Sequence, residues 1–221
     1  AMVRGDRSVT TYYAPANATV IRATGSLYYG SAGQQAPTST ITAGQFESVA
    51  NPYACTIDFD LLLRNGGADK TFYVWDPLLT GYYGLGGFQT ISGALGYLPT
   101  PGGTSNYPTG VPVSTIQSGQ AVLMHATGSN GGVVFTEGAK VTSSNNVFRT
   151  PLHVSLLQAQ LFRQDGTLAD GNYTGFDNSF SNQYDGQDAI KIPHSTENFD
   201  IAAHSKRLSV MTRRPVHRGD T

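Results

Sequence analysis

The sequence predicts an all-β protein: an antiparallel β-sandwich of jelly-roll type, built as two packed sandwiches or as one extended sandwich, with one short helix. Three observations predict this class. Charged residues make up 13% of the 221-residue chain, against about a quarter in an average protein. The 26 glycines and 11 prolines separate short runs of β-branched and aromatic residues, which is typical of strands joined by turns. No long window shows the 3.6-residue period of an amphipathic helix.

Charge and composition exclude several classes of partner. The formal net charge of -1 argues against a broad surface for nucleic acid or anionic lipid. No apolar run approaches the length of a membrane-spanning helix, so we expect no membrane insertion. The single cysteine, Cys55, cannot form an internal disulfide, and a chain of this length can bury a core without such a link.

The stretch 46–92 holds the only Trp, the only Cys and the densest aromatic cluster. Residues 71–76 predict a strand that ends at Asp76-Pro77. Its alternation places Phe72 and Val74 on one face and Tyr73 and Trp75 on the other. We expect Trp75 to be buried, and residues 88–92 to form the return strand after a loop at 77–87.

Residues 58–64 predict the short helix. Asp58 can cap the free amides of its first turn, and Gly66-Gly67 can stop it. A strand is the alternative, because Ile57, Phe59 and Leu61 also alternate.

The rest of the chain predicts strands and loops in two modules. In the first, residues 1–148, which contain the Asn-Pro-Tyr and Tyr-Val-Trp-Asp-Pro motifs, we expect early strands at 8–13, 18–24 and 39–49. A long Gly/Pro-rich loop follows at 93–114, and segments 120–126 and 132–137 are expected to pair as a hairpin across 127–131. The second module, 149–221, is β-rich and lacks a closing element, so we expect a piece of a longer protein. Whether the two halves share one core stays open.

Catalytic motifs are missing from the sequence. It contains no Gly-x-Ser-x-Gly elbow, no His-Glu-x-x-His pair and no phosphate-binding loop. The five histidines are scattered without zinc spacing, and His125 is interpreted as a packing residue. We therefore expect a protein that is not an enzyme and has no cofactor, apart from one possible structural ion.

That ion is calcium. The Asn- and Gly-rich loop at 177–188 gathers carboxylates, and calcium takes six to eight oxygen ligands from such loops. Asp177, Asp185 and Asp188 are the candidate ligands. The alternative is favoured: Asp and Asn side chains also cap turns by themselves.

Four loop tyrosines are the candidate ligand-binding residues: Tyr82, Tyr83, Tyr97 and Tyr107. Aromatic faces can stack on the apolar faces of sugars, with amides and carboxylates nearby to bind the hydroxyl groups. Rings in loops are more often available to a partner than rings in strands. These tyrosines therefore predict a site for a polysaccharide.

Several short motifs occur in an order that resembles one known family. They are Val3-Arg-Gly-Asp-Arg7-Ser, Ser48-Val-Ala-Asn-Pro-Tyr53, Ile57-Asp58-Phe59, Phe72-Tyr-Val-Trp-Asp-Pro77, Ile116-Gln-Ser-Gly-Gln-Ala121, Asn146-Val-Phe-Arg149, Phe176-Asp177, Tyr184-Asp185-Gly-Gln-Asp188-Ala-Ile-Lys191 and Glu197-Asn198. The chain is similar to the β-sandwich modules of Bacteroidetes surface and secreted proteins that precede a type IX secretion sorting domain.

The resemblance implies a non-catalytic, extracellular or outer-surface module that serves adhesion or structural display. Its expected partners are a polysaccharide or a surface protein, and the neighbouring domains of a longer chain. The alternative is a carbohydrate-binding module attached to a secreted polysaccharide-degrading enzyme.

Overall fold

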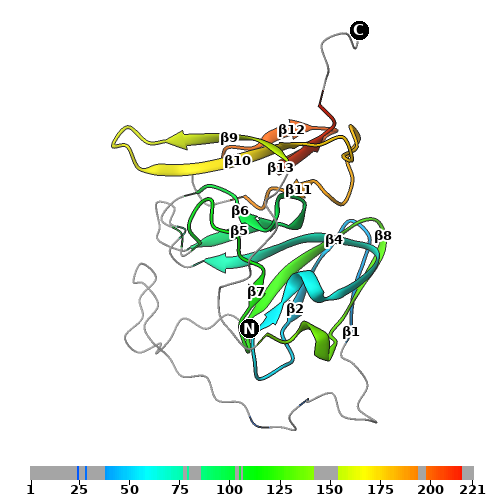
Figure 1. Ribbon diagram of the computed structural model, residues 1–221. Coiled ribbons are helices and arrows are strands. Elements are labelled where there is room, and N and C mark those ends of the chain that lie inside the picture. The colour runs from blue at the N-terminus through cyan, green and yellow to red at the C-terminus, as the bar shows by residue number, and fades with distance from the viewer. Residues whose placement is uncertain are drawn as a thin grey trace.

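The computed structural model (Figure 1) describes residues 24, 28, 38–76, 79, 86–102, 105, 107–141, 154–193 and 198–215. Several expected features lie outside these residues: the strand at 8–13, the strand at 18–24 except for residue 24, the junction at residue 148, Tyr82 and Tyr83. Within them the regular structure consists of strands and three short 3₁₀ turns, with no α-helix. The predicted all-β, sandwich-like class is confirmed.

A six-stranded antiparallel sheet forms the first half. Its strands are β1 (Thr38–Ile41), β2 (Phe46–Ala50), β4 (Leu63–Asp76), β5 (Gly87–Ser92), β6 (Leu98–Pro99) and β8 (Ala121–Val134). The order is β1-β8-β4-β5-β6, and β2 also pairs with β8. The two 14-residue strands, β4 and β8, therefore form the centre of the sheet.

A small ladder covers one face of this sheet. β3 (Ile57–Asp58) pairs with β7 (Thr115–Ile116), and the turn η1 (Phe59–Leu61) follows β3 directly. A hydrophobic core lies between the ladder and the sheet. Its buried side chains include Ile41, Val49, Tyr53, Ile57, Phe59, Phe72, Val74, Ile91, Tyr97, Ile116, Val122, Met124, Val133 and Phe135. Phe72 and Val74 thus share a core face, as their alternation predicts.

A five-stranded sheet forms the second half. Its strands are β9 (Ser155–Phe162), β10 (Leu168–Phe176), β11 (Ala189–Ile190), β12 (Ile201–Ala203) and β13 (Lys206–Arg213). The order is β11-β13-β10-β9, with β12 also on β13. The β10–β13 pair is parallel and the other pairs are antiparallel, so this sheet is mixed.

The two halves pack against each other. Figure 1 shows the five-stranded sheet lying over β5 and β6. Leu95, from the turn η2 (Gly93–Leu95), forms a second buried cluster with Tyr173, Ala189 and Val210. Beside this cluster, the Ser209 hydroxyl donates to Thr90 Oγ1 at 3.2 Å. Apolar and polar contacts therefore join the two sheets.

The helix predicted at 58–64 is wrong. Only the three-residue turn η1 forms, although Asp58 does cap it by accepting a hydrogen bond from the Asp60 amide. Leu62 is already extended and β4 starts at Leu63. Burial of Phe59 and Leu62 against the core, with Leu61 and Leu63 exposed, favours the extended path. Gly66-Gly67 lies at an irregularity inside β4 and ends no helix.

The hairpin predicted across 127–131 is also wrong, because β8 runs through this segment as one strand. The glycines have another purpose here. A Cβ on Gly67 would lie 2.2 Å from the Ser129 carbonyl oxygen, and one on Gly131 would lie 2.4 Å from the Ala68 amide nitrogen. These glycines let the middles of β4 and β8 approach more closely than side chains allow.

Trp75 is half-buried rather than part of the core. Its ring packs edge-on against Phe88, with the ring centroids 5.2 Å apart. Tyr73, two residues earlier on the same face, is fully buried. The Ile190 backbone of the five-stranded sheet reaches Tyr73 on this face of β4, whereas Trp75 lies further towards the strand end.

Candidate functional site

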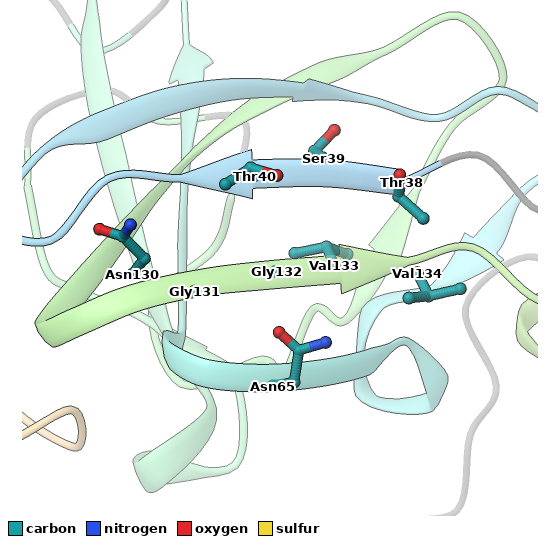
Figure 2. Close-up of a pocket in the computed structure, with 9 residues that line it drawn as sticks. All are labelled: Thr38, Ser39, Thr40, Asn65, Asn130, Gly131, Gly132, Val133 and Val134. Atoms are coloured by element: carbon teal, nitrogen blue, oxygen red, sulfur yellow. The ribbon is translucent and has the colours of Figure 1, made fainter.

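The candidate binding site is a cavity of about 310 Å³ on the β1–β8–β4 part of the first sheet (Figure 2). Its lining residues come from all three strands: Thr38, Ser39, Thr40, Asn65, Asn130, Gly131, Gly132, Val133 and Val134. Antiparallel pairing places them together, since Thr40 and Asn65 both lie opposite Gly132. Residues about 90 positions apart in sequence therefore meet at one site.

Glycines shape the floor of this cavity. A Cβ on Gly132 would lie 2.6 Å from Asn65 Oδ1, so glycine at this position lets the Asn65 amide lie across the strand. The Asn130 amide is oriented by a hydrogen bond from the Ala43 amide to its Oδ1, at 2.9 Å. The Asn65 amide thus lies against this glycine floor, whereas Oδ1 of Asn130 is already bound by Ala43.

The cavity is uncharged, and its lining combines polar and apolar groups. The hydroxyls of Thr38 and Thr40 and the amides of Asn65 and Asn130 can each donate and accept hydrogen bonds, whereas Ser39 alternates to the opposite face with its partner Val133. None of the described lining residues carries an ionisable side chain. Such a site matches a neutral ligand rich in hydroxyl groups, and it offers no countercharge to an ion.

The predicted tyrosine platform does not form as expected. Tyr97 is 2% exposed and belongs to the first core, where its hydroxyl donates to Asp60 Oδ1 at 2.6 Å. Its position in a turn predicted exposure, but its positive φ of 63° turns the ring inwards against Phe59 and Phe72. The prediction of an exposed Tyr97 is therefore wrong.

Tyr107 is half-buried and packs against the same core. Its hydroxyl accepts a hydrogen bond from Gln120 Nε2 at 3.3 Å, and burial raises the pKa of this phenol. Of the two predicted binding tyrosines that the structure describes, Tyr97 is therefore buried and Tyr107 is half-buried.

The three candidate calcium ligands have other partners. Asp177 Oδ1 accepts from the Ser179 amide at 2.8 Å, and Asp185 Oδ1 accepts from the Gln187 amide at 2.8 Å. Asp188 is buried, accepts from the Thr212 amide at 2.7 Å and forms an ion pair with Arg213 at 3.2 Å. Among the described residues no group of three or more His, Cys, Asp or Glu side chains could hold a metal ion. The calcium site stays a prediction.

A buried acid–base pair lies where the two sheets meet. His125 Nδ1 and Asp69 Oδ2 are 2.7 Å apart, and each side chain is 3% exposed. The Thr127 hydroxyl lies 3.3 Å from Asp69 and 3.4 Å from the Tyr184 hydroxyl. Burial raises the pKa of Asp69, while the hydrogen bond and charge of His125 oppose that rise. Since Tyr184 comes from the second half, this group spans the junction.

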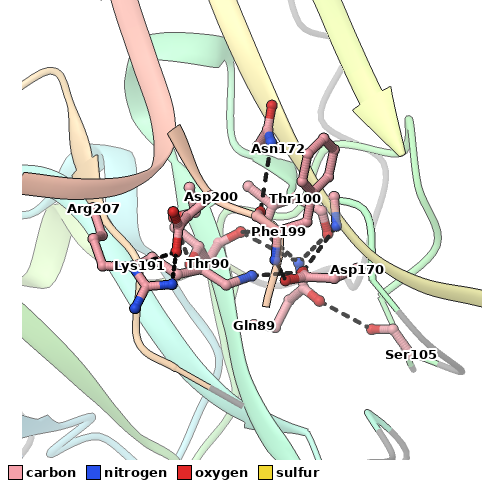
Figure 3. A network of polar contacts seen from close by, with 12 residues as sticks. Gln89, Thr90, Thr100, Ser105, Asp170, Asn172, Lys191, Phe199, Asp200 and Arg207 are labelled. Atoms are coloured by element: carbon pink, nitrogen blue, oxygen red, sulfur yellow. Dashed lines mark hydrogen bonds and ion pairs between the residues drawn. The ribbon is translucent and has the colours of Figure 1, made fainter. Parts of the chain in front are cut away.

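A second network surrounds Asp170 in the five-stranded sheet (Figure 3). Asp170 Oδ1 lies 2.5 Å from Lys191 Nζ, and both side chains are buried. Nearby, Gln89 Nε2 donates to the Thr100 carbonyl oxygen, which fixes the loop that lies under this sheet. Polar contacts within each half thus lie close to each other at the junction of the two sheets.

Sequence reasoning missed these ion pairs. The members of the Asp69–His125 pair are 56 residues apart and those of the Asp170–Lys191 pair are 21 apart. One local signal was present. Asp69 is separated from Tyr73 by an even number of positions along the same strand, so both side chains point to the same, buried face. The cavity has no such signal, because its residues meet only through strand pairing.

In the described parts of the chain, no helix has both the length and the apolar character needed to cross a membrane. Comparisons with known protein families, curated proteins and solved structures find no match to this chain.

Proposed function

We propose that this chain is a non-catalytic module of a larger exported bacterial protein, located outside the cell or on its outer surface, where it serves adhesion or structural display. One observation carries the proposal. Residues of the motifs that resemble the family form hydrogen bonds and ion pairs that hold strands and loops together. Asn51, from the Asn-Pro-Tyr motif, donates to the carbonyl oxygens of Cys55, Ile116 and Gln117. This amide ties three segments together.

The downstream motif also contributes structural contacts. Asp188 holds the β13 backbone at Thr212, and Lys191 pairs with Asp170 of β10. Tyr184, at the start of the same motif, reaches Thr127 of the first sheet. In the described structure these polar and charged side chains thus form contacts between strands. Such contacts are expected in a module with a rigid structural role.

The location can be tested on intact bacteria that produce the parent protein. Antibodies against this chain are expected to label unbroken cells or the culture medium. Labelling that requires cell lysis would contradict an exported module. An antibody against a cytoplasmic protein, applied to the same cells, shows that they are intact.

The second candidate function is carbohydrate binding, and the neutral cavity favours it. Its uncharged lining of hydroxyl, amide and apolar groups fits a polysaccharide better than it fits an anion or a peptide with charged side chains. The test is a glycan array probed with the wild-type chain and with Asn65→Ala. Loss of one neutral hydrogen bond is expected to weaken binding by about threefold to tenfold.

The matched control is Asn178→Ala. Asn178 is exposed in the 177–188 loop of the second half, away from the cavity. This variant is expected to bind like the wild type. Binding that is insensitive to Asn65→Ala would place any glycan site elsewhere and remove the cavity from the proposal.

A further inference from the structure

Lys191 and Asp170 form an ion pair that is almost completely shielded from water. Lys191 Nζ lies 2.5 Å from Asp170 Oδ1, and the side chains are 4% and 1% exposed. Lys191 directly follows β11, whereas Asp170 belongs to β10, and β13 separates these two strands. The contact therefore reaches across an intervening strand (Figure 3).

The two oxygens of the Asp170 carboxylate have different surroundings. Oδ1 faces Lys191 and also accepts from the Gly171 amide at 2.8 Å. Oδ2 accepts from the Phe199 amide at 2.7 Å. A backbone N–H aimed at one carboxyl oxygen can stabilise negative charge that develops there when a nucleophile attacks the carbon.

The amine is suited to become that nucleophile. Burial lowers the pKa of Lys191, against the opposing charges of Asp170 and Asp200. Asp200 is in turn paired with Arg207, whose Nε lies 2.6 Å from its Oδ2. Where water is excluded, the ion pair of ammonium and carboxylate is favoured much less over the neutral pair of amine and carboxylic acid than it is in water.

We propose that Lys191 and Asp170 condense into an intramolecular isopeptide bond that crosslinks the five-stranded sheet. A proton first passes from Nζ to Oδ1 across their contact, leaving a neutral amine and a carboxylic acid. The Nζ lone pair then attacks Asp170 Cγ, and the Phe199 N–H stabilises the charge on Oδ2. The Cγ–Oδ1 bond breaks, Oδ1 leaves as water with a second proton from nitrogen, and Oδ2 becomes the amide oxygen.

The proximity of the two groups and the exclusion of water make this condensation feasible without an external reagent. Groups held in reacting geometry behave as if present at about 10⁵–10⁸ M, and release of water from a buried site opposes the reverse hydrolysis. The crosslink would close the chain between residues 170 and 191 covalently. This inference is independent of any ligand and goes beyond the proposed display role, although a covalently closed sheet would suit a module under mechanical load.

The test is the intact mass of the purified full chain, measured after denaturation. The wild type is expected to weigh one water molecule less than its sequence requires. Lys191→Met and Asp170→Ala are each expected to show the full mass of their sequences. A wild-type chain at full mass overturns the proposal, and this reading does not depend on whether either variant folds.

Another reaction with the same mass change must be separated from this one. Asp170 precedes Gly171, and an Asp-Gly pair can also lose water by closing a succinimide on its own backbone. That ring would persist in Lys191→Met, so a retained mass deficit in this variant overturns the isopeptide. A tryptic digest of the wild type provides the positive identification: a branched peptide that joins the two segments, uncut after Lys191.

The chain offers a matched control in Lys140 and Glu137. These side chains lie 2.6 Å apart but are 26% and 48% exposed, so water reaches both. Lys140→Met is expected to retain the same one-water deficit as the wild type. Disappearance of the deficit in this variant would assign the crosslink to the wrong lysine and overturn the proposal.

Discussion

Asp69 and His125 lie 2.7 Å apart at the place where the two sheets meet, and the Tyr184 hydroxyl is linked to them through Thr127. The acid and the base come from the central strands β4 and β8, whereas Tyr184 comes from the second half. This pair lies between the centre of the six-stranded sheet and the second half that covers it, and it stabilises their contact. A buried acid or base that loses its partner destabilises the fold instead.

The first prediction concerns this pair. Asp69→Ala is expected to lower the free energy of unfolding by about 3–5 kcal/mol, because it leaves His125 buried without its acceptor. Chemical denaturation of both proteins measures the difference. The control is Glu137→Ala, which removes an exposed ion pair and is expected to cost about 1 kcal/mol or less. Equal costs for the two variants would contradict a special role for the buried pair.

The second prediction concerns the contact between the halves. Leu95 is fully buried in the cluster with Tyr173, Ala189 and Val210. Leu95→Ala is expected to destabilise the protein by about 2–5 kcal/mol through lost burial and the remaining cavity. Leu61→Ala, at an exposed position, is the matched control and is expected to change stability by about 0.5 kcal/mol or less. If the two halves unfold in separate transitions and Leu95→Ala shifts neither, the shared cluster does not couple them.

The third prediction tests the close approach of β4 and β8. A Cβ on Gly67 would meet backbone oxygens of Ser129 at 2.2 Å and Thr127 at 2.4 Å. Gly67→Ala is therefore expected to cost about 1–3 kcal/mol from overpacking. At Gly138 the nearest atom to an added Cβ is 3.8 Å away, so Gly138→Ala is expected to be nearly neutral. Melting temperatures that fall equally in both variants would argue against the close crossing of the strands.

The fourth prediction is a pH dependence. Burial raises the pKa of Tyr53 from its ordinary value of 10.0 to about 12. Between these values the unfolded chain releases the phenolic proton while the folded chain retains it, so stability falls as pH rises. The Tyr53 contribution is thus intact below pH 10.0 and is lost as pH passes about 12. Tyr53→Phe is expected to lose less stability than the wild type over this range, in urea titrations at several pH values. Parallel pH profiles for the two proteins would contradict the shift.

The fifth prediction concerns calcium. Asp188 is paired with Arg213, and the Asp177 and Asp185 carboxylates accept from amides of their own turns. We expect that removal of divalent ions with a chelator leaves the melting temperature unchanged. A lower melting temperature after chelation, restored by added calcium alone, would instead support the predicted calcium site at this loop.

Much of the local structure could be predicted from the sequence. Period-two alternation placed Phe72 and Val74 together on a core face, and the short side chain of Asp58 predicted the cap that η1 uses. Both signals act over a few residues, because neighbouring dihedral angles and side-chain directions determine them. The Asn- and Gly-rich loop at 177–188 likewise contains the self-capped turns that its composition favours.

The sequence by itself thus determined that this chain forms strands with polar turns, and which residues of a strand share a face. Only the tertiary structure decided that β8 continues through a Gly-rich segment, that Tyr97 turns into the core and that Asp170 meets Lys191. The physical reason is that these outcomes depend on strand order and on the packing of one sheet over another. Contacts between residues distant in sequence set that order, and no short window of sequence contains both partners.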